Sequence, residues 1–228
     1  MNNKTIHSFW ISGPLSAINL LTIRSFQKHG HEFILYAYDL SITNECEVRD
    51  ARLILPESEI YYYKRMLGGN PNFKFGGIAE RLKAEMLYAI GGWHVDLDVT
   101  CLKPFDFDAD YVLRPHAKGI VGNIIKAPAQ SELARQYILE TKTIDENNRI
   151  WEKGFMGLNR IARELQLEKY ILRKELLGND SSEYWEWFLK AGEQPDDSLY
   201  AIHWCNAMQK GYEAGSFMEK LRGEYGIS

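Results

Sequence analysis

Two aspartates separated by a single residue, Asp96 and Asp98, follow a short apolar stretch that begins after Gly91 and Gly92. Because side chains alternate along a strand, we expect both carboxylates on the same side of the chain, within reach of one divalent cation. Like charges this close repel each other and need a cation or another partner. Hard cations such as Mg²⁺ and Mn²⁺ prefer carboxylate oxygens and often share substrate phosphates. The spacing therefore predicts a metal clamp for a nucleotide diphosphate.

The first forty residues predict the sheet that carries this clamp. Apolar strands are expected at residues 6–11 and 33–38, with a helix over residues 15–29 that ends at Gly30. Strand, helix and strand in this order are typical of a doubly wound α/β layer. In such open sheets, ligands bind at the carboxyl ends of the strands, and Asp96 and Asp98 are predicted to lie at such an end.

The rest of the chain continues the same pattern. A helix is expected over residues 78–90, where apolar side chains recur every four residues, and a loop over residues 67–77 beside the site. Further strands are predicted at 52–55, 102–105, 111–113, 119–125 and 199–204, and further helices at 131–143, capped by Ser131, and at 155–167. No linker divides the chain, so one α/β domain over residues 1–228 is expected.

Composition limits the classes of protein to consider. The 228 residues are 45% hydrophobic and 25% charged, with a net charge of −4, which is typical of a globular protein and gives no support for a nucleic-acid partner. The three cysteines are far apart and odd in number, so no disulfide framework is expected. Without a signal-peptide pattern or a membrane-spanning apolar run, we expect a cytoplasmic protein, with peripheral contact at the inner face of the cytoplasmic membrane left open.

The helix before the aspartates adds a family resemblance. Residues 79–99 resemble the central motif of the DXD glycosyltransferases, which include polysaccharide and capsule mannosyl- and galactosyltransferases and the large glucosylating bacterial toxins. The Leu-Tyr pair at 87–88, the Gly-Gly pair at 91–92 and both aspartates match in register. Glu80 stands where the family has Asp, and Lys83 where it has Arg. The pattern is not matched at Ala79, Ala84 and His94.

This resemblance implies a fold and an activity. The fold would be a single GT-A domain, with a Rossmann-like, mostly parallel central sheet flanked by helices. The activity would be metal-dependent, retaining transfer of a hexose from a nucleotide-diphosphate sugar to a glycan or lipid-linked saccharide, as in the synthesis of bacterial surface polysaccharide. The implied cofactors are Mn²⁺ or Mg²⁺ and a UDP-sugar in preference to a GDP-sugar. No catalytic nucleophile is assigned.

The resemblance also implies roles for particular residues. Asp98 would bind the metal, and Asp96 would help to anchor it while holding the ribose or donor sugar. Trp10, in a segment similar to the family's opening strand and turn, would stack on the nucleotide base. Glu80 would bind a sugar hydroxyl, and Lys83 would place a positive charge near the phosphate or sugar.

Each of these roles has a structural alternative. Trp10 could belong to the sheet core, and Lys83 could be an ordinary exposed lysine that pairs with Glu80 along the helix. Residues 201–204 resemble the family's C-terminal histidine segment, so His203 or Asn206 would add a metal contact, which Mn²⁺ accepts more readily than Mg²⁺. A histidine at a strand end can instead serve only in a hydrogen bond.

Two other classes of function remain open. Residues 96–100 also resemble the D-x-D-x-T motif of haloacid-dehalogenase-type phosphatases, in which Asp96 would attack phosphorus and Asp98 would be the acid/base. That family carries the motif on its first strand, whereas a strand-helix-strand unit and a helix precede it here. The Asp-to-Glu and Arg-to-Lys changes also leave open an inactive nucleotide-sugar-binding module.

Overall fold

A six-stranded sheet forms the centre of the molecule, in the order β3-β2-β1-β4-β7-β6. The computed structural model describes residues 4–62, 75–117, 119–146, 151–178, 184–205 and 211–227. The strands of the sheet are β1 (Thr5–Trp10), β2 (Glu32–Ala37), β3 (Glu47–Asp50), β4 (Gly92–Val95), β6 (Val112–His116) and β7 (Gly119–Ala127). The first four run parallel, and β7 is antiparallel to both of its neighbours. The predicted mostly parallel α/β sheet is confirmed.

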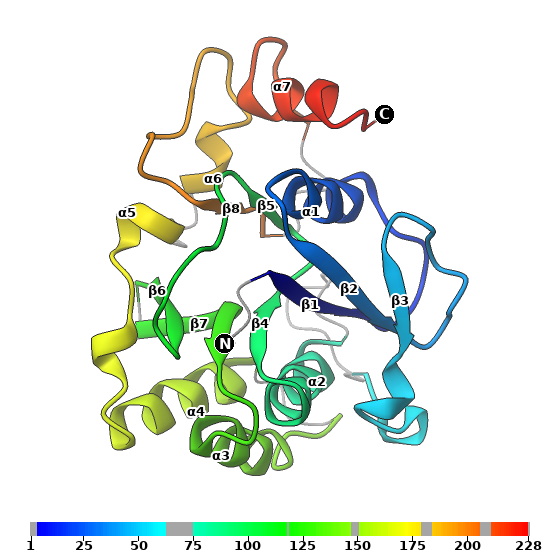
Figure 1. The fold of residues 1–228 in the computed structure, drawn as a ribbon, viewed down its shortest axis with the longest axis vertical. Helices are drawn as coiled ribbons and strands as arrows, with labels where there is room; N and C mark the ends of the chain where they lie inside the picture. Colours follow the sequence, from blue (N-terminus) through cyan, green and yellow to red (C-terminus); the bar gives the residue numbers. More distant parts are fainter. Residues whose placement is uncertain are drawn as a thin grey trace.

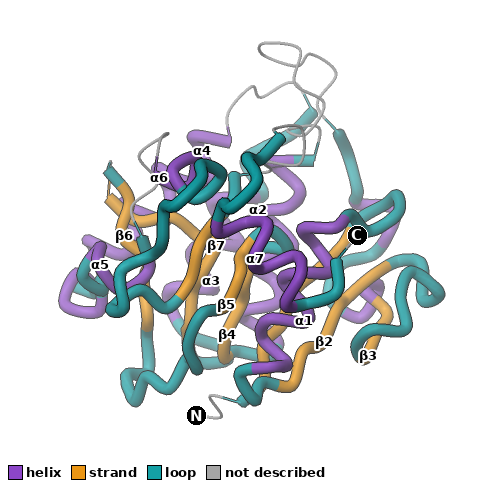
Figure 2. Tube along the Cα trace, turned by 90° about the horizontal axis from the view of Figure 1, so that it is seen from above, coloured by secondary structure: helices purple, strands orange, loops and turns teal. Residues whose placement is uncertain are grey.

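Helices cover both faces of this sheet (Figure 1). Helix α1 (Ala17–Lys28) lies on one face, with α7 (Phe217–Glu224) packed against it, and α2 (Gly76–Ala89), α3 (Glu132–Thr141) and α4 (Trp151–Glu164) lie on the other. Figure 2 shows the same layers from above, with strands in orange and helices in purple. Short helical segments complete the described chain: η1 (Ala51–Leu53), η2 (Glu57–Glu59), η5 (Glu168–Tyr170), α5 (Lys174–Leu177) and α6 (Tyr184–Trp187). None of the described helices is long and apolar enough to cross a membrane.

Strand alternation explains how the two faces are filled. In β2, Phe33 and Leu35 pack into the apolar cluster under α1, whereas Ile34 and Tyr36 face the opposite cluster with Met86 of α2. A strand with apolar side chains on both faces is typical of a parallel sheet covered by helices on both sides.

The connection from α2 to β4 depends on glycine. Helix α2 buries Ile78, Leu82 and Met86, as predicted, and ends at Ala89, with Ile90 as its C-cap. Gly91 then adopts a φ of +68°, and a Cβ atom there would lie 2.2 Å from the backbone nitrogen of Ala129. Because only glycine fits such a close backbone approach at positive φ, this residue fixes where β4 begins.

Two predicted strands are wrong. Residues 52–55 do not form a strand: β3 ends at Asp50, whose carboxylate accepts a hydrogen bond from the Arg52 backbone nitrogen and starts a 3₁₀ turn. Leu53 in this turn is 77% exposed, so the apolar run reflects no buried strand. Residues 102–105 also lie outside any strand, because the strand that pairs here, β5 (Val99–Cys101), ends earlier.

The remaining predicted elements fall where they were expected, except for one segment. Ser131 accepts a hydrogen bond from the backbone nitrogen of Ala134 and caps α3, as predicted. The predicted loop over residues 67–77 lies outside the described residues as far as residue 74, and its last two glycines, Gly76 and Gly77, begin α2.

Candidate functional site

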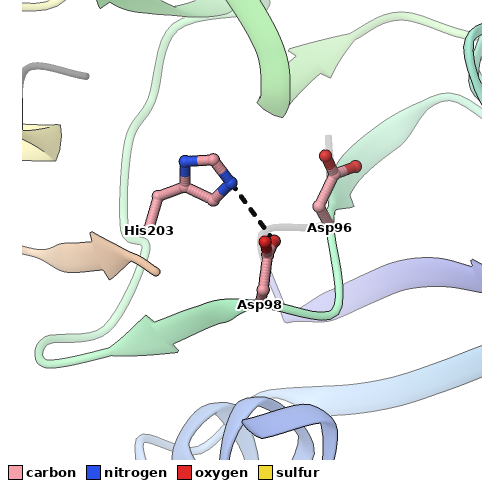
Figure 3. Close-up of side chains that lie close together, drawn as sticks. All are labelled: Asp96, Asp98 and His203. Carbon is pink, nitrogen blue, oxygen red and sulfur yellow. Dashed lines mark ion pairs between the residues drawn. The ribbon is translucent and has the colours of Figure 1, made fainter. Parts of the chain in front are cut away.

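The two aspartates lie in a turn at the carboxyl end of β4. The strand stops at Val95, and Leu97 and Asp98 form a turn that leads directly into β5. The predicted strand alternation therefore does not bring the carboxylates together; the turn does. One ligand atom from each of Asp96, Asp98 and His203 lies within 4.8 Å of the other two (Figure 3).

Each residue of this turn is held by a different element. The Asp96 backbone nitrogen donates to the carbonyl of Asn123 in β7 at 2.8 Å, and the Asn19 side-chain amide in α1 donates to the carbonyl of Leu97 at 2.8 Å. The Trp204 backbone nitrogen donates to the Asp98 carbonyl at 2.9 Å. Three contacts from distant parts of the chain thus fix the backbone from which both carboxylates project.

His203 reaches the turn through a second, two-stranded sheet. Strand β8 (Ala201–His203) pairs antiparallel with β5, which places His203 opposite Val99. Its Nε2 lies 3.2 Å from Oδ1 of Asp98, a carboxylate that is only 6% exposed. The buried Trp204 indole donates to the Thr100 hydroxyl at 2.7 Å and fastens the two strands together. The structure therefore brings the predicted His203 to the aspartates, while Asn206 lies outside the described residues.

The three side chains suit a divalent cation. Carboxylate oxygens are the ligands that Mg²⁺ and Mn²⁺ prefer, and an added imidazole favours Mn²⁺ over Mg²⁺. Nearby, the buried ammonium group of Lys83 lies beside the carboxylates of Glu80 and Asp96. Among the described residues, Glu80, Asp96 and Asp98 bring negative charge to this region, and a bound divalent ion would offset it.

Lys83 is a buried part of this site. The side chain is 3% exposed, and its Nζ lies 3.1 Å from Oε1 of Glu80 and 3.6 Å from Oδ1 of Asp96. The alternative of an ordinary exposed lysine is wrong, although the pairing with Glu80 along α2 is present. Burial by itself would lower the pKa of Lys83, but the charges of Asp96 and Glu80 outweigh it, and the pKa is raised. Lys83 therefore stays charged.

Asp96 is kept ionised by the same contacts. Burial opposes the charged form, but the charge of Lys83 and the hydrogen bond from His94 outweigh it and hold the pKa of Asp96 well below its usual range. A carboxylate in this state accepts hydrogen bonds and can bind a cation, which a protonated acid does poorly.

Glycines leave the room that Glu80 and Lys83 occupy. A Cβ atom at Gly122 would lie 3.0 Å from Cδ of Lys83, and a Cβ atom at Gly154 in α4 would lie 2.9 Å from Cγ of Glu80. On the other side of Glu80, the hydroxyl group of the buried Tyr137 of α3 donates a hydrogen bond to Oε2 of Glu80. Nothing in the sequence indicated a role for Tyr137, which has the pattern of a buried position on a helix.

Replacing Tyr137 with phenylalanine is expected to lower the free energy of unfolding by about 2 kcal/mol, since the hydrogen bond goes to a charged partner. Burial and the charge of Glu80 raise the pKa of Tyr137, so its hydroxyl remains a donor at neutral pH. Urea unfolding at pH 7 measures the effect. Tyr212→Phe, at a position that is 38% exposed, is the matched control, and equal loss in both variants would contradict the prediction.

His94 was not predicted to belong to the site. It is 1% exposed in β4, and its Nε2 lies 2.9 Å from Oδ1 of Asp96. Its ring stacks on Phe9 of β1, with centroids 5.3 Å apart. The only signal in the sequence was that a histidine stands two residues before Asp96, on the same face of a strand, where it departs from the family motif.

Trp10 lies at the carboxyl end of β1, next to the strand that delivers the aspartates. It is half-buried, and its indole nitrogen donates to the Gly13 carbonyl at 2.7 Å. Part of its ring also packs against the core cluster that includes Val95. The position suits a base-stacking role, and the packing suits the alternative role in the core.

Comparison with solved structures gives a likeness in fold. No protein-family model matches the chain, and no curated protein sequence matches it. Among solved structures, the chain is similar to one titled "PaToxG Glycosyltransferase", with a TM-score of 0.54 and 16% sequence identity over 71% of this chain and 68% of that one. At this identity the likeness establishes the fold. The chain therefore has the fold of a known glycosyltransferase.

Proposed function

We propose that this chain is a metal-dependent glycosyltransferase that takes a hexose from a nucleotide-diphosphate sugar. The observation that carries the proposal is the convergence of Asp96, Asp98 and His203 at the carboxyl edge of the sheet. Ligands bind at this edge in open α/β sheets, and the fold of a known glycosyltransferase supports the same chemistry. Fold alone does not fix function, so the argument rests on the site.

The chain's own residues would divide the work of binding the donor. Asp98, His203 and Asp96 would hold Mn²⁺ or Mg²⁺ with the diphosphate, and Trp10 would stack on the base. A bound divalent cation stabilises the negative charge that develops on a departing diphosphate. Glu80 and Lys83, fixed on α2, would orient the donor sugar, and the charge of Lys83 keeps Asp96 ionised.

The finer assignments extend this proposal. We infer a UDP-sugar donor, transfer with retention by front-face attack of the acceptor, and a saccharide or glycolipid acceptor in bacterial surface polysaccharide synthesis. Residues 1–228 would act as a single domain in the cytoplasm, with peripheral contact at the inner face of the membrane as an open alternative. The donor, stereochemical and acceptor assignments follow from the resemblance of residues 79–99 to the DXD glycosyltransferases.

A screen of UDP- and GDP-sugars for Mn²⁺-dependent hydrolysis tests the proposed activity, combined with isothermal titration of each donor with and without Mn²⁺. We expect hydrolysis and donor binding that both disappear in EDTA. Metal-dependent donor binding without any turnover, even with acceptors, would identify a binding module. Hydrolysis of a simple phosphate ester without nucleotide-sugar binding would identify a phosphatase that uses Asp96 and Asp98.

Replacing Trp10 with alanine is expected to weaken donor binding by about tenfold, because a stacked base is worth about 1–3 kcal/mol. The far-ultraviolet circular dichroism should change little, since Trp10 ends its strand. Titration of UDP in the presence of Mn²⁺ measures the effect. Trp10→Phe keeps an aromatic face and should lose less. Unchanged donor affinity in Trp10→Ala would assign this tryptophan to the core.

A further inference from the structure

The two oxygens of Asp96 have different surroundings. Oδ1 lies 2.9 Å from Nε2 of His94 and 3.6 Å from Nζ of Lys83. Within the described part of the chain, no hydrogen bond or ion pair reaches Oδ2. One oxygen is thus occupied by protein groups, and the other is left for a ligand.

The imidazole of His94 is fixed in a single orientation. Its ring is 1% exposed and stacks on Phe9 with an interplanar angle of 16°. Nδ1 is buried and has no hydrogen-bond partner among the described residues, so Nε2 alone ties the ring to a polar group. A carboxylate only accepts hydrogen bonds, so the proton of this contact belongs to Nε2.

We infer that His94 is a positioning residue that holds Oδ1 of Asp96, so that Oδ2 faces the cation and the donor. This inference rests on the proposed function and adds to it. A carboxylate free to rotate about its last bond would present either oxygen and would lose conformational freedom when it binds a cation. With Nε2 of His94 and Nζ of Lys83 on the same oxygen, the plane of the carboxylate is set before the ligand arrives.

Residues that orient a metal ligand without touching the metal affect how tightly the metal binds. Removing such a partner costs about 10- to 100-fold in metal affinity or activity. For His94, the loss should appear in metal affinity itself, before any donor is added. A residue that served only to pack the sheet would change stability without this loss.

Three variants at position 94 separate positioning from packing. In His94→Gln the side-chain amide nitrogen can take the place of Nε2, whereas in His94→Asn it takes the place of Nδ1, which has no partner. His94→Phe keeps the stacked ring and removes the donor. His7 is the matched control, because it lies opposite His94 in β1 and is similarly buried, at 7% exposed, but has no contact with Asp96.

Mn²⁺ binding is measured without donor, from the electron paramagnetic resonance signal of free Mn²⁺, with thermal unfolding of each metal-free variant in parallel. We expect His94→Phe and His94→Asn to weaken Mn²⁺ binding by about 10- to 100-fold, and His94→Gln to recover most of the affinity. His7→Phe should bind Mn²⁺ as the wild type does.

Two results in the variants would overturn the inference alone. Wild-type Mn²⁺ affinity in a folded His94→Phe would show that the hydrogen bond positions nothing. Equal losses in His94→Gln and His94→Asn would show that the ring acts through packing. A wild-type chain that binds no Mn²⁺ would instead overturn the proposed metal clamp, and the inference with it.

Discussion

Replacing Asp98 with alanine is expected to abolish metal-dependent donor binding and sugar transfer while the fold stays intact. Asp98 lies between Asp96 and His203, and Nε2 of His203 is 3.2 Å from its Oδ1. Without this carboxylate, a cation keeps one carboxylate and one imidazole in the cluster. We expect Mn²⁺ affinity to fall by at least about 100-fold, because a direct ligand contributes more than the partners that orient it.

The fold should survive because backbone contacts, rather than the carboxylate, hold this turn. The Asp98 carbonyl accepts from the Trp204 backbone nitrogen, and Asn19 holds the carbonyl of Leu97. Titration of UDP with and without Mn²⁺, together with thermal unfolding, measures both effects. Asp110→Ala, which removes an exposed carboxylate, is the control and should bind normally. Full activity of Asp98→Ala in EDTA would rule out the metal clamp.

Replacing Lys83 with methionine is expected to destabilise the protein by about 3 kcal/mol at pH 7. Breaking a buried ion pair leaves an uncompensated charge and costs about 3–5 kcal/mol. The lower end applies here because Glu80 and Asp96 are partly exposed, at 22% and 33% of their side chains. Donor binding should fall as well, since two carboxylates without a counter-charge repel each other beside the site.

The pH dependence of this loss distinguishes electrostatics from packing. In the wild type, the pKa of Asp96 is held below its usual range, so its stabilising contact is present above about pH 4 and is lost as the pH falls below that. In Lys83→Met, the pKa of Asp96 should rise because the charge that lowers it is gone, and protonation of Asp96 then relieves the repulsion. The deficit in stability should therefore be largest at pH 7 and shrink toward pH 4.

Urea unfolding at pH 7, 5 and 4 measures this deficit. Lys142→Met, at an exposed position that follows α3, is the matched control and should lose little at any pH. A deficit that is constant across this range would mean that Lys83 matters for the volume that it fills rather than for its charge.

The sequence predicted the frame of the site because local patterns encode it. Capping by Ser131 and the four-residue spacing of apolar side chains in α2 act within a few residues, and the structure confirms both. Glycine at position 91 likewise indicates the end of the helix from the sequence alone, since few other residues adopt its positive φ. The failures came where a short apolar run was ambiguous: instead of a strand over residues 52–55, the structure has the 3₁₀ helix Ala51–Leu53, which Asp50 caps.

The sequence by itself determined which charged groups the candidate site carries. These are two carboxylates one residue apart after a glycine-bounded strand, with Glu80 and Lys83 on the preceding helix. Only the tertiary structure decided how these groups meet. The pairing of β5 with β8 places His203 next to Asp98, although more than a hundred residues separate them in the sequence. The packing of α2 buries Lys83 beside Asp96, where its positive charge offsets the negative charge of the carboxylate. Strand pairing and burial depend on contacts between distant segments, which no local spacing records. His94 lies only two residues before Asp96, but the stacking on Phe9 of β1 that fixes its ring is again a contact between distant segments.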